Sequence, residues 1–200
     1  MLISFEGIDG CGKSTQISIL KEKLITLGFS VQVFREPGGT EVSEQIRSIL
    51  LNTGLDINPV AELLLFSSAR AQLMAEKVLP ALEKGGVVIL DRFYDSTTAY
   101  QGYGRESLPL PEIEQINHIA SHQRAPDVTF YMKISVEESQ KRTSHLEKDR
   151  MEQAGEHFFE KVIAGFDELS KKDSRFKIID ASQTVEDIHD QIMKELLTYL

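Results

Sequence analysis

The sequence is poor in cysteine, tryptophan, basic residues and long hydrophobic runs. Its single cysteine, Cys11, excludes an internal disulfide and a zinc site built from cysteines, so the fold needs no oxidising compartment. The 22 basic residues against 31 acidic ones give a net charge of −9, which argues against a nucleic-acid polymer or an anionic membrane as a partner. No apolar run approaches the roughly 20 residues that cross a bilayer. Residues 1–6 lack the basic start and apolar core of a signal peptide, and we therefore expect a cytoplasmic protein.

What the sequence does contain is a regular alternation of strand and helix patterns. With 41% hydrophobic, 26% charged and 8% aromatic residues it is neither fibrous nor disordered. The run Val87–Leu90 is apolar throughout, which is typical of a strand buried on both faces of a sheet. The alternation predicts a single α/β domain over residues 1–200, with a doubly wound parallel sheet of five strands flanked by helices. The predicted strands are 2–6, 30–34, 87–90, 127–133 and 176–180, and the predicted helices are 13–27, one starting at 40, 60–84, 94–102, 111–123, 136–145, 155–172 and 185–198.

The residues best suited to chemistry follow the predicted strands directly. They form three groups, at 7–14, 35–39 and 91–101. In doubly wound sheets, ligands bind outside the carboxyl ends of the strands. The three groups are therefore expected to meet at one edge of the sheet.

The strongest motif is the glycine-rich segment Gly7–Ser14, which has the pattern G-x-x-x-x-G-K-[ST] between a predicted strand and a predicted helix. Glycines let the backbone N–H groups wrap a phosphate, and the helix N-terminus adds its positive end. Lys13 is expected to reach the β- and γ-phosphates, and the Ser14 hydroxyl to bind Mg²⁺. The segment predicts a nucleoside triphosphate site.

Two further features favour a kinase with a second pocket for a phosphate acceptor. Asp91 ends the buried strand, where an acidic residue can hold Mg²⁺ through water, and the adjacent Arg92 can bind an acceptor phosphate. Phe66 and Arg70 stand four residues apart on one face of a predicted helix, where they could stack on and hydrogen-bond a base. The Asn-Lys-x-Asp segment of a signalling GTPase is missing from the sequence.

Six short blocks together resemble bacterial thymidylate kinases. The blocks are Phe5–Gly10, Gly12–Thr15, Arg35–Thr40, Leu65–Arg70, Asp91–Phe93 and Thr98–Gly104, in family order. The resemblance implies transfer of the ATP γ-phosphate to dTMP, giving dTDP for dTTP synthesis. It also implies Mg²⁺ as the cofactor, ATP and dTMP as the only small-molecule substrates, and a homodimer.

The resemblance also assigns roles to single residues. Phe66 would stack on thymine, Arg70 would bind its exocyclic oxygen, and Tyr100 would crowd a ribose 2′-hydroxyl. The implied dTMP-binding residues are Arg35, Phe66, Arg70, Arg92, Thr97, Tyr100 and Gln101, with Arg47 a weaker candidate. The implied ATP-binding residues are Gly7, Ile8, Asp9, Gly10, Cys11, Gly12, Lys13, Ser14, Thr15 and Arg142. The catalytic candidates are Lys13, Arg92, Arg150 and Asp9, and the metal candidates are Ser14 and Asp91.

A short helical lid is expected at 145–156. In the eukaryotic-type subgroup an arginine in the glycine-rich loop acts on the transferring phosphate, but Gly10 occupies that position here. The resemblance therefore points to a lid arginine. Arg150 is the prediction, and its replacement by alanine should lower kcat far more than it changes dTMP affinity. Arg142 stays open as the alternative.

Two other classes of function remain open. Another nucleoside monophosphate kinase, or a deoxynucleoside kinase, would share the glycine-rich loop. A non-catalytic switch protein would bind ATP and transfer its phosphate to no acceptor.

Overall fold

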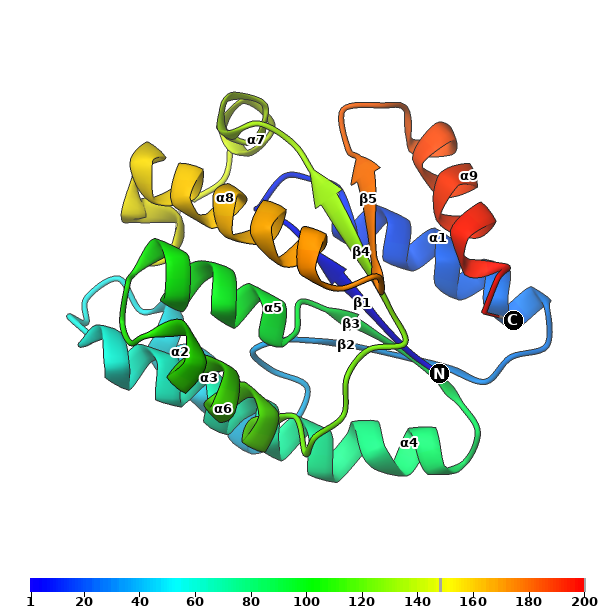
Figure 1. Ribbon diagram of the computed structural model, residues 1–200, viewed down its shortest axis with the longest axis horizontal. Coiled ribbons are helices and arrows are strands. Elements are labelled where there is room, and N and C mark those ends of the chain that lie inside the picture. Colours follow the sequence, from blue (N-terminus) through cyan, green and yellow to red (C-terminus); the bar gives the residue numbers. More distant parts are fainter. Residues whose placement is uncertain (148, 200) are drawn as a thin grey trace.

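The computed structural model describes residues 1–147 and 149–199, in which all five predicted strands form one parallel sheet (Figure 1). The strand order is β2-β3-β1-β4-β5, so the chain crosses over from one side of β1 to the other. The doubly wound α/β prediction is confirmed. The strands are β1 (Leu2–Glu6), β2 (Val31–Arg35), β3 (Val87–Asp91), β4 (Val128–Lys133) and β5 (Phe176–Asp180).

The helices follow the predicted alternation. They are α1 (Lys13–Thr26), α2 (Glu41–Leu51), α3 (Pro59–Leu73), α4 (Leu79–Glu83), α5 (Tyr94–Thr97), α6 (Leu110–Ala120), α7 (Val136–Thr143), α8 (Glu156–Lys172) and α9 (Val185–Leu196). Side-chain hydrogen bonds cap the N-termini of several of these helices. The Thr40 hydroxyl accepts from the Ser43 amide, and the Thr184 hydroxyl accepts from the Asp187 amide.

Three helical predictions need correction. The segment predicted as one helix over 60–84 is α3, a π-helical turn at Met74–Val78 and α4. The helix predicted over 94–102 is α5 followed by a π-helical segment at Thr98–Gly104. Within the predicted helical lid, the described residues before α8 form turns and one 3₁₀ turn at Glu152–Ala154, and residue 148 lies outside the described residues.

The lid does not continue as an α-helix because its ends are fixed locally. The Asp149 carboxylate accepts from the backbone N–H groups of Met151 and Glu152, which closes a turn. Gly155 then adopts a φ of 88° and separates this turn from α8. A chain that is capped at one end and interrupted at the other has room for a single turn.

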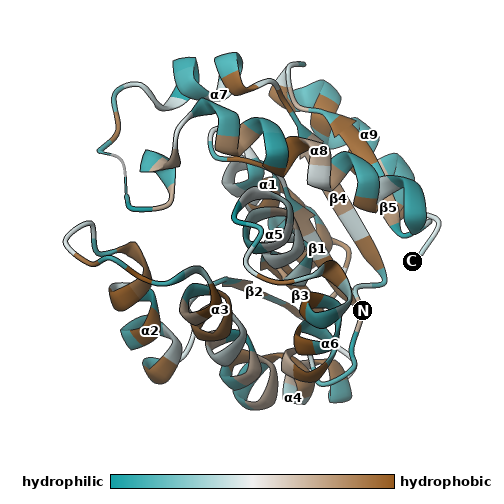
Figure 2. Cartoon of the chain, turned by 60° about the vertical axis from the view of Figure 1, so that its left-hand side comes forward, coloured by the Kyte–Doolittle hydropathy of each residue, from teal (hydrophilic) through white to brown (hydrophobic). Residues whose placement is uncertain are grey.

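The core lies on both faces of the sheet. Ile3 and Phe5 of β1 belong to a buried cluster with apolar residues of α1 and α9, including Leu20 and Ile192. On β1 the side chains alternate, so Leu2 belongs to a second cluster, with residues that end α3 and lead into α4. Figure 2 shows hydrophobic residues along the strands and hydrophilic residues on α7. Within the described chain, no helix has both the length and the apolar character that a membrane span requires.

Candidate functional site

The glycine-rich loop joins β1 to α1 in a conformation that depends on its glycines. Gly7, Gly10 and Gly12 have φ angles of 135°, 74° and 89°, in the region that side chains other than glycine rarely adopt. A Cβ atom on Gly7 would lie 2.5 Å from the carbonyl oxygen of Met132. The loop wraps Lys13, whose ammonium donates to the carbonyl oxygens of Gly7 and Ile8, each at 3.1 Å.

A cavity opens over this loop, and we call it the loop cavity. Five basic side chains, four of them arginines from different parts of the chain, line it together with four carboxylates, so its formal charge is slightly positive although the whole chain is acidic. The residues that line it are Asp9, Gly10, Gly12, Lys13, Ser14, Thr15, Arg35, Glu36, Arg47, Asp91, Arg92, Arg142, Thr143, Leu146 and Glu152. Such a lining suits a polyanion.

A second cavity adjoins it beneath α3, and we call it the inner cavity. It is narrower and combines aromatic side chains with charged ones. The residues that line it are Asp9, Glu36, Pro37, Arg47, Leu51, Phe66, Arg70, Arg92, Phe93, Ser96, Thr97, Tyr100, Gln101, Asp149 and Met151. Asp9, Glu36, Arg47 and Arg92 line both cavities, so the two adjoin at these side chains.

Arg92 stands at the junction of the two cavities. Its guanidinium donates to the Gly7 carbonyl oxygen at 2.8 Å and to Asp9 Oδ1 at 2.8 Å, and it lies 5.0 Å from the centre of the Tyr100 ring. Burial alone would raise the pKa of Asp9, but the charges of Arg92 and Lys13 outweigh burial and hold the pKa below its usual value. The junction therefore carries an ionised carboxylate paired with a fixed arginine.

The backbone at Arg92 is itself held in an uncommon conformation, with a φ of 69°. Glu6, the last residue of β1, accepts from the Phe93 amide at 2.8 Å and from the Ser96 hydroxyl at 2.5 Å. Burial, with a contribution from the charge of Asp95, raises the pKa of Glu6 to about 8. Glu6 thus fixes the turn that aims Arg92.

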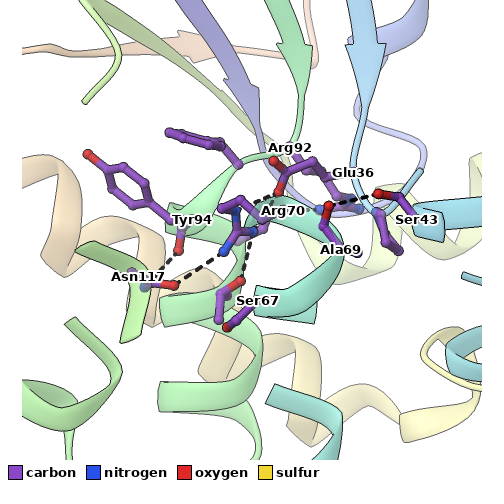
Figure 3. Close-up of polar contacts among 12 residues, drawn as sticks. Glu36, Ser43, Ser67, Ala69, Arg70, Arg92, Tyr94 and Asn117 are labelled. Atoms are coloured by element: carbon purple, nitrogen blue, oxygen red, sulfur yellow. Dashed lines mark hydrogen bonds and ion pairs between the residues drawn. The ribbon is translucent and has the colours of Figure 1, made fainter. Parts of the chain in front are cut away.

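Arg70 is buried at the closed end of the inner cavity and reaches three partners (Figure 3). Its Nε and Nη2 lie 2.7 and 2.6 Å from Glu36 Oε2, Nη2 also donates to Thr97 Oγ1 at 3.0 Å, and Nη1 donates to Asn117 Oδ1 at 3.3 Å. Burial raises the pKa of Glu36, and the charge of Arg70 opposes this rise. The pair is a buried, hydrogen-bonded ion pair.

Two buried polar atoms of the inner cavity lack a partner among the described residues. They are Glu36 Oε1 and the Tyr100 hydroxyl oxygen. Because a buried polar atom without a hydrogen bond is costly, such atoms in a cavity indicate a polar ligand or ordered water. Phe66 adds an aromatic surface in the same cavity. The inner cavity is therefore suited to a ligand with a flat ring and polar edges.

Comparison with known proteins agrees with this geometry. The family model described as thymidylate kinase matches residues 5–192. The chain belongs to the thymidylate kinase family. A thymidylate kinase of Thermoanaerobacter sp. (strain X514) is 47% identical over 199 residues, covering 99% of this chain and 98% of the relative. A thymidylate kinase of Chlorobaculum parvum is 49% identical over 207 residues, covering 98% and 95%. The crystal structure of thymidylate kinase from Ehrlichia chaffeensis matches with a TM-score of 0.77 at 32% identity, covering 98% of each chain.

The structure brings together most of the residues that the thymidylate kinase resemblance singled out. Six of the seven residues assigned to dTMP line the inner cavity: Phe66, Arg70, Arg92, Thr97, Tyr100 and Gln101. The seventh, Arg35, lines the loop cavity instead and pairs with Glu44 at 3.2 Å. Of the residues assigned to ATP, all but Gly7, Ile8 and Cys11 line the loop cavity, and those three belong to the loop itself.

The two candidate arginines of the thymidylate kinase lid lie in different places. Arg142 lines the loop cavity and donates to the carbonyl oxygens of Gly10 at 3.3 Å and Ala181 at 3.0 Å. Arg150 lines neither cavity, and its guanidinium pairs with Glu62 at 2.6 Å. Arg150 therefore does not face the loop cavity in this conformation.

Sequence reasoning missed several acidic residues of the site. Glu6 and Glu36 fall inside blocks quoted for the family resemblance, but nothing in their spacing indicated which arginine each would meet. Glu62 and Asp149 carry no motif signal. Each is recognised only through its partners in the folded chain.

Proposed function

We propose that this protein transfers the γ-phosphate of ATP to dTMP, giving dTDP, a step in dTTP synthesis. The observation that carries the proposal is that the two cavities adjoin and share Asp9 and Arg92 in their linings. Phosphoryl transfer needs two bound groups held in line and neutralisation of the charge that develops between them. A cationic cavity joined to an aromatic, polar one provides this arrangement.

In the loop cavity, the triphosphate of ATP would lie over the backbone N–H groups of the glycine-rich loop. Lys13 would exchange its two carbonyl partners for phosphate oxygens, which are stronger acceptors for an ammonium group. Arg142, which already faces this cavity, is placed to contact the nucleotide. The catalytic role assigned to Arg150 stays a prediction that requires its release from Glu62.

In the inner cavity, dTMP would place its base against Phe66 and Arg70 and its phosphate at Arg92. The Tyr100 ring lies against the guanidinium of Arg92, where it would meet the sugar next to that phosphate. Thr97 and Gln101 line the wall near the base. This orientation directs the phosphate of dTMP toward the loop cavity.

The cofactor would be Mg²⁺. The loop cavity offers it the Ser14 hydroxyl and the Asp91 carboxylate, which are oxygen donors of the kind that Mg²⁺ prefers. Among the residues that the structure describes, no group of three or more His, Cys, Asp or Glu side chains could hold a metal alone. This agrees with the way Mg²⁺ binds in phosphoryl-transfer sites, through one or two protein groups together with phosphates and water. When bound, Mg²⁺ would neutralise charge on the transferred phosphoryl group.

A homodimer and a cytoplasmic location also belong to the proposal. Apolar residues are exposed on the adjacent helices α2, α3 and α6, and Figure 2 shows hydrophobic residues on α2 and α3. Val42, Ile49 and Leu64 are 48%, 44% and 47% exposed, and Ile119 is 74% exposed. Such a surface is suited to contact with a second copy. Light scattering on the purified protein tests this, and a monomer at working concentration would contradict it.

A coupled assay of ADP release with a panel of acceptors tests the function. We expect turnover with dTMP and little with UMP, dCMP or thymidine, and dUMP measures how far the methyl group matters. Turnover of thymidine or UMP, together with no turnover of dTMP, would overturn the proposal in favour of another nucleoside or nucleotide kinase. ATP binding without transfer to any acceptor would favour a switch protein.

A further inference from the structure

Glu62 is a buried carboxylate in the first turn of α3, and none of the steps above uses it. It accepts from three side chains on two other segments. Gln101 Nε2 lies at 2.9 Å and Arg105 Nε at 3.4 Å, both beside the inner cavity, and Arg150 Nη1 of the lid lies at 2.6 Å. One side chain therefore joins α3, the π-helical segment that carries Gln101, and the lid.

Arg150 is held on more than one side. Besides its ion pair with Glu62, its Nε donates at 2.7 Å to the carbonyl oxygen of Leu50, close to the end of α2. The side chain is 12% exposed, so this is a largely desolvated contact. An arginine held by a buried carboxylate and a backbone carbonyl has little freedom to move.

The neighbours of Arg150 show what the contact positions. Asp149 and Met151 both line the inner cavity, one residue on each side of the anchored arginine. Met151 Sδ also lies 3.9 Å from Arg105 Nη2 and 3.5 Å from Arg150 Nη2. Anchoring Arg150 thus holds two lining residues of the inner cavity in place.

We infer that Glu62 is a positioning residue for acceptor binding. Through Arg150 it anchors the lid segment 149–151 against the inner cavity, and through Gln101 it fixes a side chain that lines the same cavity. The inference rests on the proposed function. Loss of the anchor loosens the inner cavity more than the loop cavity, because segment 149–151 supplies Asp149 and Met151 to the lining of the inner cavity and no residue to that of the loop cavity. The anchor and catalytic roles of Arg150 therefore predict different kinetics.

The test compares Glu62→Gln, Arg150→Ala and the double variant with Glu106→Gln as a matched control. Glu106 pairs with Lys161 at the same 2.6 Å, but its side chain is 69% exposed and lines neither cavity. We expect Glu62→Gln and Arg150→Ala each to raise KM for dTMP about tenfold, with a smaller change in KM for ATP, and Glu62→Gln to keep kcat within about twofold. The double variant should be less affected than the sum of the two single ones, since the contact between Glu62 and Arg150 is lost only once. The control should behave as the unchanged protein does.

Hydrogen–deuterium exchange supplies a readout that does not depend on turnover. The backbone amides of Met151 and Glu152 are hydrogen-bonded to Asp149 and should exchange faster in Glu62→Gln, while those of α1 should not. A thermal melt reports whether each variant folds. If Glu62→Gln does not fold, Arg150→Ala carries the test.

Two results would overturn the inference. One is a large loss of kcat in Arg150→Ala with an unchanged KM for dTMP, which is the outcome for a catalytic arginine. The other is an unchanged KM and unchanged lid exchange in Glu62→Gln. Failure of the unchanged protein to phosphorylate dTMP would instead contradict the proposed function, and the exchange experiment would still report on the anchor.

Discussion

The loop cavity takes its floor from six residues of the short segment 9–15, whereas the inner cavity takes its walls from segments far apart in the chain. The floor is shaped by backbone conformation, because Gly7, Gly10 and Gly12 adopt positive φ angles that other residues rarely take. The walls are shaped by ion pairs whose members are distant in sequence, such as Glu36 with Arg70. A local pattern can encode the first kind of site, and only a folded chain can assemble the second.

The two sites also handle charge differently. Lys13 in the loop is held by carbonyl oxygens, which leaves its charge free for an incoming anion. Arg70 and Arg150 are each paired with a carboxylate that is nearly inaccessible to solvent. A charge paired in this way positions a wall, and removal of Arg70 leaves the buried Glu36 carboxylate without an ionic partner. The predictions below follow from this difference.

The largest effect is expected at the junction. Arg92→Ala should lower kcat on the order of 1,000-fold, because an arginine that neutralises the transferring group is worth about that much or more. Arg35→Ala is the comparison, since the side chain of Arg35 is 57% exposed and pairs with a surface carboxylate. We expect a loss below about tenfold for it. Steady-state kinetics with dTMP measure kcat for both variants. Equal losses of kcat would show that Arg92 at the junction contributes no more than the exposed Arg35.

The next effect concerns the buried pair of the inner cavity. Arg70→Met should lower the free energy of unfolding by about 3 kcal/mol or more, because it leaves the Glu36 carboxylate buried and unpaired. Adding Glu36→Gln should restore part of the loss, since no isolated charge then remains. Urea unfolding at neutral pH measures both variants. A double variant less stable than Arg70→Met would contradict this account.

A pH-dependent effect is expected from Glu6. Its pKa rises from 4.5 to about 8 on folding, so the folded protein keeps a proton that the unfolded chain releases above pH 4.5. This group's contribution to stability therefore falls as the pH rises from about 4.5 to 8, by up to about 1.4 kcal/mol per pH unit. Glu6→Gln resembles the protonated form and should remove that slope. Urea unfolding from pH 5 to 8.5 measures the free energy of unfolding of both proteins. If it depends on pH in the same way in both, the pKa of Glu6 is not raised on folding.

The smallest effect is expected for the surface pair. Glu44→Gln removes the partner of Arg35, but both side chains are largely exposed, so stability should change by no more than about 1 kcal/mol. Added salt should shrink the difference further. The same unfolding assay checks it. A loss as large as that of Arg70→Met would remove the contrast between buried and exposed pairs.

The sequence predicted the glycine-rich loop and the places of the five strands because both depend on short-range features. Glycines at fixed spacing and a fully apolar run such as Val87–Leu90 leave few alternatives. The predicted helical lid is a single 3₁₀ turn at Glu152–Ala154, because Asp149 caps its start and Gly155, with a positive φ, ends it soon after. Arg35 was assigned to dTMP from its block, and β2 places it at the loop cavity, which Arg92 also lines.

The sequence by itself determined the fold class, the glycine-rich loop and the resemblance to thymidylate kinases. Periodicity and local backbone conformation are properties of neighbouring residues, and they can be read along the chain. The tertiary structure alone decided which carboxylate meets which arginine. Glu36 pairs with Arg70, and Glu62 pairs with Arg150, which follows it 88 residues later in the sequence. Such pairs form because burial makes an unpaired charge costly, and only the folded chain shows which charges are buried together.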